Sequence, residues 1–394
     1  MGFLRILCVS ICLLATHNMV AQSEDCQYER NSLCILLIKH YDQVHEDIVT
    51  DVFQDVPFPE RFNNHALGVR SIAFQGIQGE MSEKIKSFCQ QENVGQKMVA
   101  KWFNRDKNSG SFNMELIKER GLYNATMTQQ NVARSTMRDL RLLEDAGENL
   151  IKNTFLIVND VEYYDLHKKL TPIAKKRITD SKGLNTYKYY SKTRNYGSTR
   201  GFIVQITTYL FRLKWSEDEA GIFYNSYYTE NGLKDRDKVL SFKQDAGRWG
   251  MEYVGKNFCF EEGLERDELR DPKSLLIKLS TRALDKNLAL LQHSYPDFCI
   301  KAPLVSAEPL KAYVGQKEDI KPESKFEVLD RVIDKEGRLT YKRVGIIKPK
   351  DGRAIWDNRY MADDEDADAK MGYTEFERVS GGPFSTGMLI RETK

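Results

Sequence analysis

The order of apolar and polar residues predicts alternating strands and helices over the first 300 residues or so. Residues 154–161 are almost continuously apolar, which is typical of a strand covered on both faces. Residues 201–215 alternate between apolar and polar positions, so we expect a strand with one buried face. After a turn, residues 222–229 would return along it as the second strand of a hairpin. Further strands are predicted at 68–75 and 249–260, after a helical lead-in.

Helices are predicted where a capping residue precedes an apolar stripe of helical spacing. This pattern occurs at residues 79–92, at 113–121, and after Thr126, which forms a capping box with Gln129. Pro272 begins the clearest helix, which ends before Pro296. These elements predict an α+β domain in which helices pack on one mixed sheet.

The pattern changes near residue 310, after a loop that contains Pro303 and Pro309. Short strands with glycine-containing turns and no helix follow. They are predicted at 325–333, 339–347, 352–356, 374–379 and 387–392. Such a series indicates a small SH3-like β-barrel. We therefore expect an α+β domain over residues 22–309 and a barrel domain over residues 310–394.

The first 21 residues have the features of a cleavable export signal. One basic residue, Arg5, precedes an apolar run from Ile6 to Ala15, and Met19-Val20-Ala21 then offers a cleavage site. We expect the mature chain to begin near Gln22 and to reach the periplasm or the cell exterior. No later apolar run reaches the roughly 18 residues that a membrane-spanning helix requires.

Composition and charge limit the classes of function. The formal charge of +2 falls to +1 without Arg5, so steering of the whole protein toward nucleic acid is not expected. Five cysteines would remain in the mature chain, which leaves at least one thiol unpaired. We would test a Cys26–Cys34 disulfide first, and the alternative is that all of them are buried thiols. They are Cys26, Cys34, Cys89, Cys259 and Cys299.

A basic and aromatic segment is predicted as an insertion at about 165–200 of the first domain. Between Lys168 and Arg200 it holds ten basic residues and one acid, with tyrosines interleaved. Cations neutralise phosphate or carboxylate arrays, and tyrosine rings stack on bases or sugars. The segment is either a solvated insertion or a binding site for a polyanion, an anionic membrane surface or an envelope protein. The candidate binding residues are Lys175, Lys176, Arg177, Lys182, Tyr187, Lys188, Tyr189, Tyr190, Lys192 and Arg194.

Motifs for metals, cofactors and catalysis are incomplete. An acidic run imitates the carboxylate spacing of a calcium loop but has Ala369 where that loop needs glycine, so an acidic hairpin loop is favoured. Its carboxylates are Asp364, Asp366, Asp368 and Glu375. His45-Glu46 lacks the second histidine of a zinc-protease helix, and residues 197–201 have threonine at the centre of a nucleophile elbow. We therefore predict no catalytic residues, metal or cofactor.

An aromatic cluster falls on the predicted hairpin. It comprises Trp215, Phe223, Tyr224, Tyr227 and Tyr228. Packing in the core is the ordinary explanation for such residues. An exposed recognition surface is the alternative.

Several sequence strings resemble those of a family of uncharacterised exported proteins of Bacteroidota. They are Trp102-Phe103-Asn104-Arg105-Asp106, residues 119–125, residues 144–148, Val158-Asn159-Asp160 and residues 355–360. The resemblance implies a lineage and a compartment. The order of elements is also similar to that of the α/β domain of curli-secretion-channel proteins, with residues 119–122 and the predicted hairpin at 201–229 in corresponding places.

The sequence thus favours an exported, non-enzymatic envelope protein with a binding or assembly role. The alternative is an extracytoplasmic hydrolase with a nonstandard site.

Overall fold

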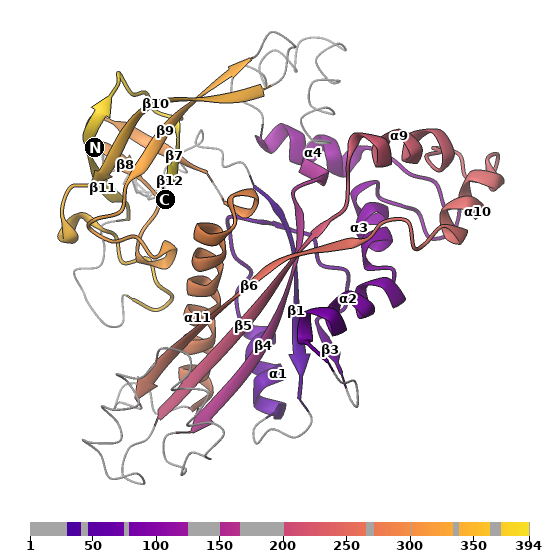
Figure 1. Cartoon of the computed structure of the whole chain (residues 1–394), viewed down its shortest axis with the longest axis horizontal. Coiled ribbons are helices and arrows are strands. Elements are labelled where there is room, and N and C mark those ends of the chain that lie inside the picture. The colour runs from indigo at the N-terminus through magenta and orange to yellow at the C-terminus, as the bar shows by residue number, and fades with distance from the viewer. Residues whose placement is uncertain are drawn as a thin grey trace, which may run out of the picture.

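The computed structural model describes residues 30–40, 46–74, 79–124, 150–165, 201–264, 272–299, 301–333, 339–362 and 372–393. It confirms the predicted α+β class: a mixed sheet with packed helices is followed by a small closed β-barrel (Figure 1). Within these ranges, no helix combines the length and the apolar character needed to cross a bilayer.

The sheet has six strands, in the order β2-β1-β4-β5-β6, with β3 also paired to β1. The strands β2, β3 and β4 all run parallel to β1, whereas β4, β5 and β6 are antiparallel neighbours. Their bounds are β1 Ser32–Lys39, β2 Asn63–Asn64, β3 Ser71–Ala73, β4 Thr154–Asp165, β5 Gly201–Leu213 and β6 Met251–Leu264. The strand predicted at 68–75 is thus the short β3.

Helices cover both faces of the sheet. One face packs on α2 (Met81–Gln91), α3 (Val94–Trp102), α4 (Glu115–Asn124), α9 (Glu217–Ser226) and α10 (Arg236–Gln244). The other face packs on α1 (Glu46–Asp55) and on the long α11 (Pro272–Ser294), as predicted for the helix at Pro272.

The expectation that residues 201–215 have only one buried face is wrong. Phe211 and Leu213 of β5 are buried against the first group of helices, and Ile206 and Leu210 are buried against α11. Helices pack on both sides of the sheet, so both faces of β5 are covered. The alternation in the sequence marks the two cores rather than one core and solvent.

The predicted hairpin at 222–229 is also wrong, because this stretch belongs to the helix α9. Ser216 is its N-cap and forms a capping box with Glu219, which closes the first turn. The helix places Phe223 fully in the core. The helical lead-in is likewise corrected, since it contains the buried strand β1 beside α1.

The barrel is closed in the order β10-β11-β8-β7-β12-β9 around its own apolar core. Its strands are β7 Ala302–Ala307, β8 Leu310–Ala312, β9 Phe326–Ile333, β10 Leu339–Pro349, β11 Thr374–Gly381 and β12 Leu389–Glu392. It therefore begins at Ala302 rather than at 310, because the expected loop around Pro303 and Pro309 forms the β7–β8 hairpin. The strand expected at 352–356 is a short 3-10 turn over Gly352–Ala354.

Candidate functional site

The helix α11 lies beside the barrel (Figure 1). Residues of α11 and of the barrel line a crevice between them. It consists of two pockets, of about 350 and about 580 Å³. Asp285 of α11 and Lys317 of the barrel line both pockets, so the pockets adjoin at this pair. We call the two pockets together the α11–barrel crevice.

Three segments that are distant in sequence build the larger pocket. Phe58 and Arg61 come from the segment after α1, Asp285 comes from α11, and Tyr313 and Trp356 come from the barrel part of the chain. The crevice therefore exists only when the sheet part and the barrel are folded against each other.

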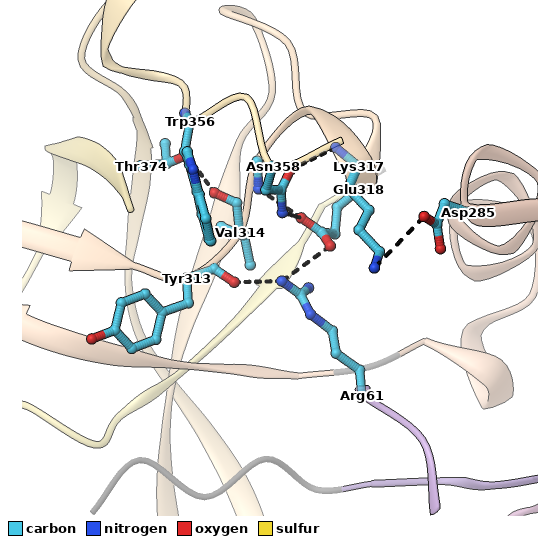
Figure 2. A network of polar contacts seen from close by, with 10 residues as sticks. Arg61, Asp285, Tyr313, Val314, Lys317, Glu318, Trp356, Asn358 and Thr374 are labelled. Atoms are coloured by element: carbon cyan, nitrogen blue, oxygen red, sulfur yellow. Dashed lines mark hydrogen bonds and ion pairs between the residues drawn. The ribbon is translucent and has the colours of Figure 1, made fainter. Parts of the chain in front are cut away.

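Gly315 allows the two barrel segments of this pocket to meet. It forms a β-bridge with Trp356, and a Cβ at this position would lie 2.1 Å from the carbonyl oxygen of Trp356. Any other residue would push these segments apart. The turn after Gly315, over Gln316–Glu318, then directs Lys317 toward α11 (Figure 2).

A polar clamp joins the sheet part to the barrel (Figure 2). The carboxylate Oε2 of Glu318 accepts hydrogen bonds from the Gly315 backbone N–H at 2.6 Å and from Asn358 Nδ2 at 2.9 Å. Its Oε1 lies 3.1 Å from Nη2 of Arg61, which also donates to the carbonyl of Tyr313. Both oxygens of Glu318 are thus engaged, and its role in the described structure is to hold the two parts together.

Asp285 differs from Glu318 in this respect. It is 8% exposed, and its buried Oδ2 has no hydrogen-bond partner among the described residues. Nζ of Lys317 lies 3.6 Å from this oxygen, which is an ion pair beyond hydrogen-bond length. Burial raises the pKa of the Asp285 carboxyl to about 6; the attraction of Lys317 lowers it and the charge of Glu318 raises it. The carboxyl therefore titrates close to neutral pH.

The smaller pocket carries charges that are arranged in pairs. Lys286 Nζ lies 2.8 Å from Glu261, and Lys321 Nζ lies 3.1 Å from Asp319. Arg282 donates to the Tyr360 carbonyl at 2.9 Å. These contacts connect α11 with β6 and the barrel. Five cations and three acids line the pocket, so it keeps a small excess of positive charge.

A second polar pair lies at the carboxyl end of β1. His40 Nε2 is 2.5 Å from Asp160 Oδ1 of β4. Because β3 and β4 flank β1 on opposite sides, this edge is a topological switch point, where open α/β sheets commonly bind ligands. The nearby Tyr209 has its pKa raised to about 12, mainly by burial and then by the charge of Asp160. The pair is a candidate polar site, although it is less enclosed than Asp285.

Few of the site residues predicted from the sequence lie within the described ranges. All ten candidates in the basic segment lie outside the described residues, as do the Asp364 to Asp368 run and Cys26, so these stay predictions. Glu375 of that acidic run lies on β11 and pairs with Lys350 at 3.2 Å. Within the described ranges, no group of three metal-ligating side chains is found.

The aromatic cluster and the cysteines belong largely to the core. Phe223 and Tyr227 are buried, and Trp215, Tyr224 and Tyr228 pack against the same core. The thiols of Cys34, Cys89 and Cys259 are free and buried, and burial raises their pKa to about 11, 12 and 12 respectively. Cys299 is partly buried, and burial also raises the pKa of its thiol. Raised values of this kind make these buried thiols poor nucleophiles at neutral pH.

The crevice had no signature in the sequence, although part of it coincides with the string at residues 355–360. The hairpin at 201–229, which supported the likeness to the curli-secretion-channel domain, is a strand followed by a helix. Neither a known protein-family model nor a curated protein matches this chain.

Proposed function

We propose that this protein is an exported envelope protein that binds or assembles with another component, and that the α11–barrel crevice is its binding site. The observation that carries the proposal is the buried carboxylate of Asp285, which opens to both pockets and has an oxygen without a donor among the described residues. Pockets with convergent polar groups and a perturbed pKa are the usual place for a ligand. The N-terminal 21 residues support export.

The alternative function is an extracytoplasmic hydrolase. One observation favours it, because a carboxyl with a pKa of about 6 is suited to general acid catalysis. A carboxylate mechanism of the glycosidase kind needs a second acid that is free to act as a nucleophile or base. Of the other acids that line the larger pocket, Glu318 has both oxygens engaged by the clamp, and Glu60 is exposed on the segment after α1. This arrangement favours binding over hydrolysis.

The proposal can be tested by filling the crevice. Gln292 of α11 lines the larger pocket and is only partly buried, so Gln292→Trp should occupy the pocket without opening the core. Gln244→Trp places the same change on the exposed end of α10, far from the crevice (Figure 1). The mature protein and both variants would be titrated calorimetrically with neutral tetrasaccharides, acidic and basic decapeptides, heparin, and vesicles containing anionic lipid.

We expect at least one probe to bind the mature protein and the Gln244→Trp control equally. Binding of that probe should fall at least tenfold in Gln292→Trp. If no probe binds, or if all binding survives Gln292→Trp, the crevice is not the binding site. Release of reducing ends or of free amines from the same probes would establish the hydrolase instead.

Export is tested separately. Residues 1–30 fused to a reporter enzyme that is active only outside the cytoplasm should give activity, and Leu13→Arg in the apolar run should abolish it. Activity that is absent from the unaltered fusion would contradict the export part of the proposal.

A further inference from the structure

We infer that the α11–barrel crevice binds a neutral ligand rich in hydroxyl groups, namely an oligosaccharide. This inference rests on the proposed function, since it assumes that the crevice is a binding site. It goes further by naming the class of ligand.

Hydrogen-bonding capacity is unused at the junction of the two pockets. Asp285 Oδ2 needs a donor, and Nζ of Lys317, 3.6 Å away, is a donor. A hydroxyl group is both a donor and an acceptor, so one ligand hydroxyl donates to Asp285 while accepting from Lys317. An ammonium or guanidinium group has no acceptor, and a carboxylate or a fully ionised phosphate has no donor, so neither satisfies both residues.

Aromatic residues form part of the wall of the larger pocket. Phe58, Tyr313, Trp356 and Tyr360 line it, and all four are partly buried rather than sealed in the core. Aromatic rings offer rigid apolar surface beside a polar tip. A sugar ring likewise has an apolar face of C–H groups and a rim of hydroxyls. The volume of about 580 Å³ lies within the range of roughly 300–1,000 Å³ that is typical of small-ligand pockets.

The charges that line the larger pocket balance, which disfavours a polyanion there. The cations that line the larger pocket are Arg30, Arg61 and Lys317, and the acids are Glu60, Asp285 and Glu318. Equal numbers of each sign leave no net attraction for a strongly charged ligand.

An extended peptide commonly binds by adding a strand to a free sheet edge. The barrel strand nearest the pocket, β8, already pairs with both β7 and β11. The closed barrel therefore offers no edge at this point. In the larger pocket a peptide would have to be held by side-chain contacts. Strand addition is confined to the side of the smaller pocket, where Glu261 belongs to the edge strand β6.

The test uses the mature protein and calorimetric titration with neutral tetrasaccharides of glucose, N-acetylglucosamine, mannose and xylose. We expect one or more to bind. Asp285→Asn, which replaces one acceptor oxygen with a donor group, should weaken that binding at least about tenfold. Asp51→Asn, an exposed aspartate on α1, is the matched control and should leave it unchanged.

Trp356 tests the aromatic wall. Trp356→Ala should weaken saccharide binding about tenfold or more, whereas Trp356→Phe, which keeps a ring, should retain binding within about threefold. Circular dichroism would verify that each variant folds. If Trp356→Ala does not fold, the comparison of Asp285→Asn with wild type decides the matter.

The outcomes separate the two proposals. If a peptide, heparin or a vesicle binds in a manner abolished by Gln292→Trp while no tetrasaccharide binds, the crevice is a binding site but the saccharide inference is wrong. If no probe binds at all, both fail. If saccharides bind equally well to Asp285→Asn and Trp356→Ala, they bind elsewhere and the inference is overturned.

Discussion

The charge of Asp285 should destabilise the folded protein at neutral pH. The pKa of this carboxyl is about 6 in the folded protein, against an ordinary value of 3.8, so folding disfavours the ionised form. Because one pKa unit corresponds to 1.36 kcal/mol, the cost at pH 7.5 is about 3 kcal/mol. Asp285→Asn removes the charge and keeps the shape. Lys317, whose side chain is 31% exposed, remains in contact with water.

The sign of the pH dependence follows from the direction of this change. Above pH 6 the carboxyl is ionised in both the folded and the unfolded states, and the whole cost is present. Between pH 6 and pH 3.8 the folded state binds a proton that the unfolded state does not. The destabilisation by the Asp285 charge therefore decreases as the pH falls through this range. Relative to wild type, Asp285→Asn should therefore be more stable by about 3 kcal/mol at pH 7.5 and by only about 1 kcal/mol at pH 4.5.

The assay is urea unfolding of wild type, Asp285→Asn and the control Asp51→Asn at both pH values. Asp51→Asn should change the free energy of unfolding by less than about 0.5 kcal/mol at either pH. A loss of stability in Asp285→Asn at pH 7.5 would refute the reasoning, since it would mean that the ionised carboxylate is well paired. A gain that does not depend on pH would refute it too, because the effect would then not come from ionisation.

Three further predictions concern the core and are all read from urea unfolding. Arg120→Ala should cost at least about 3 kcal/mol, because the buried guanidinium of Arg120 donates to a histidine ring nitrogen, a serine hydroxyl and a backbone carbonyl; a loss below 1 kcal/mol would contradict this account. Leu213→Asp should cost about 3–5 kcal/mol and Arg212→Asp about 1–2 kcal/mol, because only Leu213 is fully buried; equal losses would contradict the strand's register. Ser216→Ala should cost about 1 kcal/mol through loss of the N-cap, whereas Ser226→Ala at the exposed end of the same helix should cost little.

Elements with strong local signals could be predicted from the sequence. The continuous apolar run at 154–161 and the proline that opens α11 each carry their information within a few residues. The same holds for β9, β10, β11 and β12, whose turns contain glycine or polar clusters. The residues within and next to each of these elements favour the same secondary structure as the tertiary fold does.

The predictions were wrong where one pattern of residues is compatible with two structures. Residues 222–229 are rich in aromatic side chains, which favours a strand, but the Ser216–Glu219 capping box starts a helix there. A strand whose residues alternate between apolar and polar normally has one solvent-exposed face. Here Tyr209 and Leu210 lie in different cores, because helices cover both sides of the sheet. Segments that are distant in sequence determine whether the second face of a strand is covered. The sequence of the strand alone does not contain this information.

The crevice lay beyond prediction for a related reason. Arg61, Asp285 and Glu318 are ordinary charged residues among many, and nothing in their spacing connects them. They meet only because the Gly315 turn and α11 place them together. The basic segment at 165–200 was easy to recognise because its charged residues are close together in sequence. Closeness in sequence does not show that side chains converge on one site.

Glu318 and Asp285 lie in the same crevice, but only one of them has contacts that explain its presence. Glu318 accepts two hydrogen bonds and one ion pair, and this set of contacts is sufficient to explain its presence as a clamp. Asp285 is buried at a cost of about 3 kcal/mol and has an oxygen without a donor in the described structure, so fold stability does not explain it. Residues that destabilise the folded state are expected at functional sites. If Asp285→Asn gains stability and loses ligand binding together, the unpaired carboxylate is kept for the ligand rather than for the fold.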